Sequence, residues 1–498
     1  MTPRERLQAL PAERLQAPPA LPAFLRSALS EQNPFQSTDE AVAWLRAAGE
    51  SRKLQVEPIP FADLDEWSFE PETGDLVHRS GKFFRVQGLR VGTDSEPGWD
   101  QPIINQPEVG ILGIIAREID GQLYFLMQAK LEPGNPLGVQ LTPTVQATRS
   151  NYTQVHQGAR PRYVEYFLAR GSGQVLVDEL QFEQGSVFLR KRNRNIVIQV
   201  KEDVPAADGY CWLTLGQIKK LLQYPNLVGM DTRLVIACLP LGLDVQEGGA
   251  GIKLPPPAGE GWGEGIGPGL ACSEFGAKLI RSASSVQGAH NDEEVLSWLT
   301  ELRTQRRLRR ERIGLNSVRG WQQTDAEIVH EARRFFRVLA VSVEADSREV
   351  AHWKQPLIGS TEQGLIAFLT QEIAGTLHFL VRGNVEPGNT DRVAIGPSVQ
   401  CALGFDRLSE LPMLWPPFTE LALDAPAESI RYSCIQSEEG GRFYHVENEY
   451  RFVELPASQH LDLPENYLWV NLRQLQTLLR YGFVNVEARN LLACLSLT

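Results

Sequence analysis

The chain lacks the features that mark several large classes of protein. Its formal net charge is −12, whereas general nucleic-acid binding needs a basic surface. No run of about 18 apolar residues is present, so no membrane-spanning helix is predicted. The N-terminus shows no apolar core or cleavage site of a secretory signal. We therefore expect a cytoplasmic protein with neither nucleic-acid nor membrane partners.

Metal and disulfide chemistry have little support. The six cysteines include no Cys-x-x-Cys, and Cys238 and Cys494 lie in Leu-rich tails, as expected of buried thiols in a reducing compartment. The eight histidines are scattered and form no His-Glu-x-x-His. P-loop, dinucleotide-binding and nucleophile-elbow patterns are absent as well. The pair Glu438-Glu439 suits a ligand hydroxyl as well as a metal, so no metal site is predicted.

The chain contains a long internal repeat. Residues 99–146 align with residues 353–400 at a constant offset of 254. Trp99-Asp-Gln-Pro102 corresponds to Trp353-Lys-Gln-Pro356, and Glu132-Pro-Gly-Asn135 corresponds to Glu386-Pro-Gly-Asn389. A match of this length exceeds a solenoid unit of about 20–50 residues. It predicts two copies of one whole domain.

Each copy is predicted to be α+β. Capped amphipathic helices are expected after Ser37 and Asn291, because a Glu follows each of them three residues later. Short Val/Ile/Leu/Phe runs then alternate with turns, as strands do, and closing helices are expected over 213–222 and 470–479. The predicted fold is a tandem duplication of a mixed-sheet domain flanked by helices.

Four segments follow from these patterns. Residues 1–36 are predicted to be a loosely ordered arm, 37–240 the first repeat, 241–290 a mobile linker and 291–498 the second repeat. The linker prediction depends on its Pro- and Gly-rich composition, which cannot hold a packed core.

Two polar clusters are candidates for ligand binding. Thr148-Arg-Ser-Asn-Tyr152, followed by His156, offers hydroxyl, guanidinium and amide groups that suit a phosphorylated or sugar ligand. Glu183-Gln-Gly-Ser186 leads into Arg190-Lys-Arg-Asn-Arg194, whose four cations suit a diphosphate. On a strand, residues 190, 192 and 194 share one face. An exposed capped loop and a solvated basic strand are the alternatives.

The two copies differ at these positions. Arg190, Lys191, Arg192 and Arg194 are replaced by His445, Val446, Glu447 and Glu449. Thr148, Asn151 and Tyr152 are replaced by Ala402, Phe405 and Asp406, and Lys130 by Asn384. Two equal anion sites are therefore not expected. One working site with a relic, or one composite site, fits better.

The chain resembles the NDP-hexose 2,3-dehydratase family over residues 37–498, apart from the linker. The motifs that carry the resemblance are Phe83–Val86, Trp99–Pro102, Phe125–Lys130, Glu132–Asn135, Pro143–Tyr152, Glu183–Ser186, Arg190–Asn195 and Glu438–His445. The resemblance implies a Nudix-hydrolase-like fold for each copy. The Nudix box, Arg-Glu-x-x-x-Glu-Glu, is missing from both copies, so metal-dependent diphosphate cleavage is not expected.

The implied reaction removes water across C2 and C3 of dTDP-4-keto-6-deoxyglucose, in deoxysugar and antibiotic biosynthesis. The resemblance implies a homodimer that needs no cofactor, and a 3,4-diketo product that an NADPH-dependent 3-ketoreductase would reduce. A non-catalytic nucleotide-sugar-binding paralogue and a Nudix-type hydrolase are the alternative functions.

The resemblance also implies ligand contacts. Trp67 and Trp321 are expected to stack on a nucleotide base. The first site is expected to use Thr148, Arg149, Ser150, Asn151, Tyr152 and Ser186, together with the first copy's cations Lys130, Arg190 and Arg192. The second site is expected to use Gln400, Cys401, Glu438, Glu439, Gly440 and Gly441, with Arg382 standing in for a family Arg.

Elimination of water needs a base, an acid and a donor for the oxyanion. The acid/base candidates are Tyr152, His156 and Glu183 in the first copy and Glu439, Tyr444 and His445 in the second. Their spacing does not choose among them. Because the second copy has lost the polar set, we expect the chemistry in the first copy.

Overall fold

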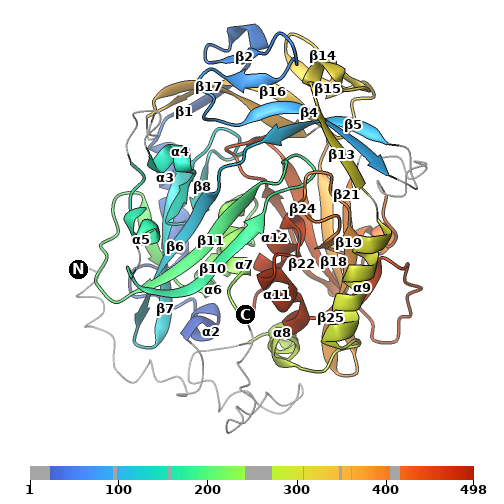
Figure 1. Cartoon of the computed structure of the whole chain (residues 1–498). Helices are drawn as coiled ribbons and strands as arrows, with labels where there is room; N and C mark the ends of the chain where they lie inside the picture. Colours follow the sequence, from blue (N-terminus) through green and yellow to red (C-terminus); the bar gives the residue numbers. More distant parts are fainter. Residues whose placement is uncertain are drawn as a thin grey trace.

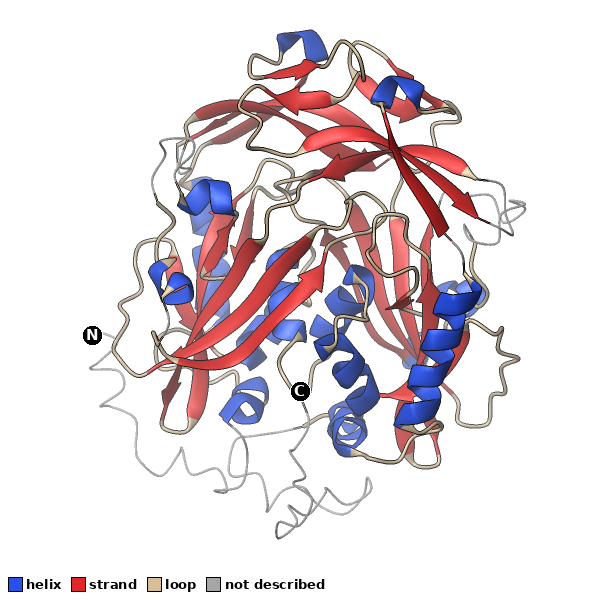
Figure 2. Cartoon of the chain, viewed as in Figure 1, coloured by secondary structure: helices blue, strands red, loops and turns tan. Residues whose placement is uncertain are grey.

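The computed structural model describes residues 23–93, 98–153, 160–169, 171–241, 272–306, 308–346, 350–360, 362–403 and 415–498. The fold is α+β, with mixed sheets and several helices, and the architecture is repeated (Figure 2). None of the helices in these ranges is both long and apolar enough to span a membrane.

Each repeat contains a seven-stranded mixed sheet (Figure 1). The first has the order β10-β11-β6-β7-β12, with β8 on β7 and β9 on β6; the second has the order β20-β19-β18-β24-β22, with β21 on β18 and β25 on β19. One pair is parallel in each, β6 with β11 and β18 with β24. The first sheet comprises β6 (Gly110–Ile119), β7 (Gln122–Leu131), β8 (Val139–Thr142), β9 (Val145–Ala147), β10 (Gln174–Phe182), β11 (Arg192–Val200) and β12 (Tyr210–Leu213). The second comprises β18 (Gly364–Ile373), β19 (Thr376–Asn384), β20 (Ala394–Gly396), β21 (Val399–Ala402), β22 (Ile430–Ser437), β24 (Glu447–Leu455) and β25 (Tyr467–Asn471).

Helices α7 and α12 pack against each other between these two sheets (Figure 1). One apolar core therefore runs through both repeats, and it includes Leu234 and Leu491. The helices of the first repeat are α2 (Ala23–Ala28), α3 (Thr38–Glu50), α4 (Arg149–Tyr152), α5 (Glu165–Leu168), α6 (Leu215–Leu221) and α7 (Met230–Ala237). Those of the second are α8 (Glu274–Ser284), α9 (Asp292–Gln305), α10 (Thr419–Leu423), α11 (Leu472–Arg480) and α12 (Val486–Ala493).

The predicted helix starts are confirmed. Capping boxes join Ser37 to Glu40 and Asn291 to Glu294, and they begin α3 and α9. The two closing helices, α6 and α11, begin two residues later than predicted, because the residues before them belong to strands β12 and β25.

Two helices lie in segments that were expected to be loose. Helix α2 falls within 1–36 and α8 within 241–290, and each is anchored by a serine. The Ser27 hydroxyl donates to the Leu123 carbonyl oxygen and accepts from the Leu215 N–H; Ser282 does the same with Leu377 and Leu472. The short match of Leu25-Arg-Ser-Ala28 with Ile280-Arg-Ser-Ala283 is the sequence signal for this pair. The Pro- and Gly-rich stretch 254–265 lies outside the described residues.

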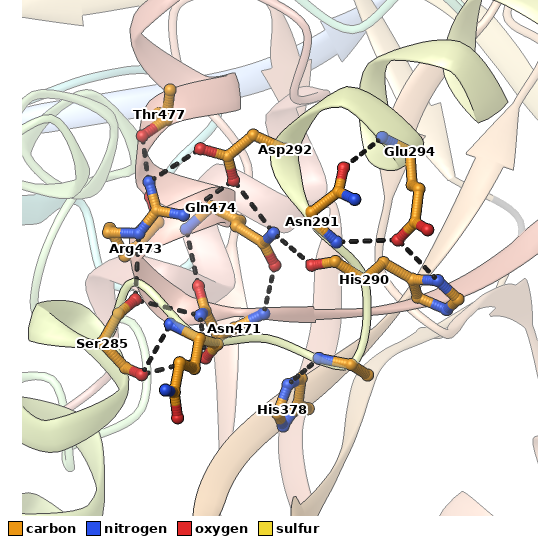
Figure 3. A network of polar contacts seen from close by, with 12 residues as sticks. Ser285, His290, Asn291, Asp292, Glu294, His378, Asn471, Arg473, Gln474 and Thr477 are labelled. Carbon is orange, nitrogen blue, oxygen red and sulfur yellow. Dashed lines mark hydrogen bonds and ion pairs between the residues drawn. The ribbon is translucent and has the colours of Figure 1, made fainter.

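The connection from α8 to α9 is held against the second repeat (Figure 3). Arg473 donates to the Ser285 carbonyl oxygen at 2.9 Å and pairs with Asp292 at 2.7 Å. The Gln474 amide donates to the His290 carbonyl oxygen at 2.8 Å. Residues 285–292 are therefore a fixed part of the second repeat, which differs from the expected linker.

Two smaller sheets exchange one strand between the repeats. Strand β13 (Leu308–Ile313), from the second repeat, pairs with β4 (Arg85–Thr93) of the first. Strand β1 (Leu54–Ile59), from the first repeat, pairs with β16 (Phe336–Ala345) of the second. The remaining strands are β2 (Trp67–Phe69), β3 (Leu76–His78) and β5 (Trp99–Asn105) in one sheet, and β14 (Trp321–Gln323), β15 (Glu327–His330), β17 (His352–Ser360) and β23 (Phe443–Tyr444) in the other. The repeats are thus interlocked, and both sheets lie across the same end of the seven-stranded pair (Figure 1).

The repeats also cross at two glycine turns. The Gly134 N–H donates to the Gly440 carbonyl oxygen at 2.7 Å, and the Gly388 N–H donates to that of Gly185 at 2.6 Å. A Cβ on Gly134 would overlap the Phe443 carbonyl oxygen, so the close approach requires glycine. The Pro-Gly turn of the first repeat therefore contacts the loop that begins at Glu438, and the Pro-Gly turn of the second repeat contacts the loop that begins at Glu183.

Candidate active site

A pocket of about 640 Å³ lies at the first repeat and is completed by the second. Strands β7, β9 and β11 and helices α4 and α7 supply one part of its wall. The loop 439–443 and residues 353–355 of the second repeat supply another part. The crossing at Gly134 places that loop there. The site is therefore composite, one of the two arrangements that the sequence comparison left open.

One end of the pocket holds a network around Gln146. The Gln146 side chain accepts from Lys130 Nζ at 2.9 Å and donates to Glu132 Oε1 at 3.1 Å. Its amide also lies 3.4 Å from Glu439 Oε1. Lys130 pairs with Glu132 at 3.1 Å. The Gln146 amide thus contacts two carboxyl groups from different repeats, Glu132 and Glu439, and the Lys130 ammonium lies beside it.

Glu439 is the group in this network whose ionisation is most useful for catalysis near neutral pH. Burial raises its pKa to about 7; the nearby Glu132 carboxylate acts in the same direction, and Arg442 and Lys130 act against them. The Gly441 N–H donates to Oε1 at 2.8 Å. In the described part of the chain its hydrogen bonds fall on Oε1, so Oε2 is left for a ligand.

A second group of ionisable side chains lies in the connection between β10 and β11 and on α7. Burial raises the pKa of Glu183, which accepts from Asn193 Nδ2 at 2.6 Å. Burial lowers the pKa of Lys191 to about 8, against the pull of the Glu183 carboxylate. Asp231, in the first turn of α7, also lines the pocket. Carboxyl and ammonium groups with shifted pKa values in one cavity are typical of acid–base catalysis.

The rest of the wall is aromatic and cationic. Trp67, His78 and Phe83 line it from the first repeat, and Trp353 and Lys354 from the second. The Trp67 indole N–H donates to the Lys354 carbonyl oxygen at 3.1 Å, which ties the two sheets together. This surface suits a planar base and an anionic linkage.

Several predicted residues line the pocket. They are Trp67, Lys130, Thr148, Ser150, Asn151, Glu183, Glu439 and Gly441. Part of the polar cluster is satisfied internally: Thr148 Oγ1 donates to Asn151 Oδ1 at 2.6 Å, and the Ser150 N–H donates to Glu108 at 3.1 Å. These contacts begin the short helix α4 and fix the orientation of the cluster.

Other predicted residues of the first repeat lie elsewhere. Arg149, Ser186 and Arg190 are exposed, Arg192 stacks over Phe182 at 4.7 Å, and Tyr152 packs against an apolar cluster. The alternation along residues 190–194 is real, but the other face, with Lys191 and Asn193, points into the pocket. Arg190 and Arg192, which were expected to contact the ligand, do not line this pocket. His156 lies outside the described residues.

The residues expected around a second site are separated. Glu439 and Gly441 face the first pocket, whereas Gln400 accepts from Asn384 and Asn485 within the second repeat. The others do not line the pocket either: Trp321, Arg382, Cys401, Glu438, Gly440, Tyr444 and His445. Glu438 is buried and accepts from Gln184, Asn448 and Tyr450, and Tyr444 stacks on His445 at 4.2 Å. The crossing at Gly134 sends the loop with Glu439 and Gly441 to the first repeat and so separates it from Gln400.

The corresponding region of the second repeat lacks the same groups. Gln184 has the position in the crossing loop of the first repeat that Glu439 has in the crossing loop of the second. Asn384 of the second repeat replaces Lys130 of the first. Asn485, at the start of α12, donates to Glu386 at 2.9 Å. Gly229 occupies that place in the first repeat and has no side chain. Lys130 and Glu439 are thus brought together at the pocket of the first repeat, and the second repeat has neither group at the corresponding positions.

Sequence reasoning missed Glu132, Gln146, Asp231 and Arg442. Glu132 and Gln146 do lie in motifs that recur in both copies, Glu-Pro-Gly-Asn and Pro-Thr/Ser-Val-Gln, so polar residues kept in both copies were an available signal. Asp231 is a single acid in an apolar stretch, and its place in the pocket follows only from helix packing.

Known proteins resemble this chain over most of its length. A family model described as NDP-hexose 2,3-dehydratase matches residues 38–239 and 292–495. A protein of Saccharopolyspora spinosa named dTDP-4-dehydro-6-deoxy-alpha-D-glucopyranose 2,3-dehydratase is 46% identical over 477 residues, which are 95% of this chain and 94% of that protein. Proteins of the same name from Amycolatopsis orientalis and Streptomyces violaceoruber are 44% and 41% identical, over 92% and 91% of this chain and 90% and 95% of their own.

Proposed function

The chain belongs to the NDP-hexose 2,3-dehydratase family, and from this premise we propose that its composite pocket dehydrates dTDP-4-dehydro-6-deoxyglucose. The enzyme is a hydro-lyase of nucleotide sugars. The observation that carries the assignment to this pocket is Glu439, a half-buried carboxyl with a pKa of about 7 beside Lys130 and Gln146.

We propose that Glu439 is the base. The C4 ketone acidifies the C3 proton, and the Glu439 carboxylate takes that proton while the electron pair forms an enolate. Lys130 and Lys191, which both line the pocket, stabilise the enolate oxygen. Collapse of the enolate then breaks the C2–O bond, the departing hydroxyl takes up a proton from an acid and leaves as water, and the resulting enol becomes the 3,4-diketone. Two of the six acid/base candidates, Glu183 and Glu439, line the described part of the pocket. The Glu183 carboxyl already accepts a hydrogen bond from Asn193.

The other end of the pocket is proposed to bind the nucleotide. The rings of Trp67, His78 and Trp353 would contact thymine, and Lys354 and Arg442 would meet the diphosphate. Each seven-stranded sheet, with its one parallel pair and packed helix, is compatible with a Nudix-like fold. The reactive 3,4-diketone would pass to an NADPH-dependent ketoreductase.

The direct test is turnover. With dTDP-4-dehydro-6-deoxyglucose, a 3-ketoreductase and NADPH, we expect a dTDP-2,6-dideoxysugar and stoichiometric oxidation of NADPH, followed by mass spectrometry and absorbance. Binding of dTDP without any dideoxysugar would contradict the proposal.

The maximum of kcat/KM should cover only a narrow range of pH. Glu439 must be ionised to act as a base, so activity should fall as the pH drops through its pKa of about 7. Lys191 must be charged, so activity should fall again above its pKa of about 8. Initial rates between about pH 5.5 and 9.5 would show these limbs. An acid limb near the ordinary glutamate pKa would rule out Glu439 as the base.

A further inference from the structure

The proposed elimination needs an acid as well as a base. Hydroxide is a poor leaving group, so the C2 oxygen must receive a proton as the C2–O bond breaks. Glu439 carries a proton only after it has taken one from C3. A second group that stays protonated beside an ionised Glu439 could supply the C2 oxygen independently of that proton.

Asp231 has the position for this role. It is the second residue of α7, its exposed fraction is 5%, and it lines the same cavity as Glu439, Glu183 and Glu132. In the described part of the chain its carboxyl makes no hydrogen bond to another protein group, unlike Glu183 with Asn193. Its oxygens are therefore available to a ligand.

The surroundings keep Asp231 neutral. Burial raises its pKa well above the ordinary value, and the carboxylates of Glu439, Glu183 and Glu132 raise it further, with Lys130 acting against them. The N-terminus of α7 favours the anion, but only with a partial charge of about half an elementary charge. A buried site with three acidic neighbours outweighs that effect, as in other carboxyl clusters that share protons.

We propose that Asp231 is the general acid that protonates the departing C2 hydroxyl; this rests on the proposed function of the pocket. The C3–H bond breaks and its proton passes to Glu439, while the electron pair moves to the C4 oxygen. The pair then returns to form the C2–C3 double bond, the C2–O bond breaks, and the Asp231 proton converts the leaving hydroxyl to water. Glu439 is then protonated and Asp231 ionised, and one proton transfer between them restores the starting state.

The duplication offers a matched control. Glu487 occupies the same place in α12 that Asp231 occupies in α7, it is also buried, and it does not line the pocket. Asp231→Asn and Glu487→Gln therefore remove equivalent carboxyls, one inside the site and one outside it. Asp231→Ala, which removes the carboxyl and introduces no amide, serves as a second variant where Asn is not tolerated.

The test measures three quantities for each variant: dehydration, exchange of the C3 hydrogen in D2O, and loss of fluoride from the 2-deoxy-2-fluoro analogue of the substrate. For Asp231→Asn we expect dehydration to fall by about 10²–10³-fold, while C3 exchange continues, because Glu439 still forms the enolate. Fluoride leaves without protonation, so the analogue should react within about tenfold of the wild-type rate. Glu487→Gln should keep all three activities.

Two outcomes would overturn the assignment. If Asp231→Asn or Asp231→Ala lost exchange and dehydration to the same extent, Asp231 would serve the base or the fold instead. If fluoride release fell as far as dehydration, it would not be the acid. Failure of the wild-type enzyme to dehydrate the substrate would refute the proposed function itself, so the two failures are distinguishable.

Discussion

Glu439→Gln is expected to lower kcat by about 10³-fold with little change in the Kd for dTDP, because a positioned base contributes about 10²–10⁴-fold and the nucleotide is proposed to bind at the other end of the pocket. Gln keeps the Oε1 atom that accepts from Gly441 and Gln146. The loop 439–443 should therefore hold its position. Steady-state kinetics and calorimetric titration with dTDP would measure both effects. The acid limb of the pH profile should disappear from the residual activity.

The same substitution should stabilise the protein at alkaline pH. The pKa of Glu439 is higher in the folded state, about 7, than in the unfolded chain, about 4.3. The wild type therefore loses stability as the pH rises from about 4.3 through 7, and the Gln variant does not. Above pH 7 we expect a gain of about 1–3 kcal/mol in the free energy of unfolding. Simultaneous loss of stability and activity would instead indicate a structural residue.

Glu386→Gln is the control for this variant. Glu386 is buried in the second repeat and occupies the position that Glu132 has in the first, outside the pocket wall. Its carboxyl is satisfied by Asn485, Asn389 and the Gly185 N–H. We expect altered thermal stability and an unchanged kcat.

Gly134→Ala is expected to reduce both stability and kcat strongly. The added Cβ would overlap the Phe443 carbonyl oxygen and meet that of Gly440, and both atoms belong to the backbone and cannot rotate away. The loop must move, at a cost of about 2–4 kcal/mol, and Glu439 moves with it. A displacement of about 1 Å at a reacting group costs about 10²-fold in rate. Thermal unfolding and kcat would be measured together.

Gly388→Ala separates the two effects. Its Cβ would overlap the Phe188 carbonyl oxygen and meet that of Gly185 at the other crossing, so a similar loss of stability is expected. That crossing does not carry Glu439. We expect a smaller loss of kcat than in Gly134→Ala, with the larger change in KM because Phe188 lines the pocket. Equal losses of kcat in the two variants would show that the position of Glu439 is not what limits catalysis.

Many of the secondary-structure elements of each repeat could be predicted from local sequence patterns. The capping boxes at Ser37 and Asn291, the constant offset of 254 residues and the alternation of side chains after Arg190 all depend on neighbours in the chain. Helix and strand periodicities are local properties, so sequence reveals them. The loss of the cationic set in the second copy predicts that the two halves are unequal.

The assembly of the pocket was decided by contacts between residues far apart in the chain. The sequence alone determined a duplicated α+β protein with polar clusters near Lys130, Thr148 and Glu439. The tertiary structure alone decided that Glu439 crosses to the first repeat, that Lys191 rather than Arg192 faces inward, and that Asp231 joins them. These choices follow from the pairing of β1 with β16, the glycine crossings and the packing of α7 on α12. Such pairings are set by the total burial and hydrogen bonding of the whole molecule, for which no short segment carries a signal.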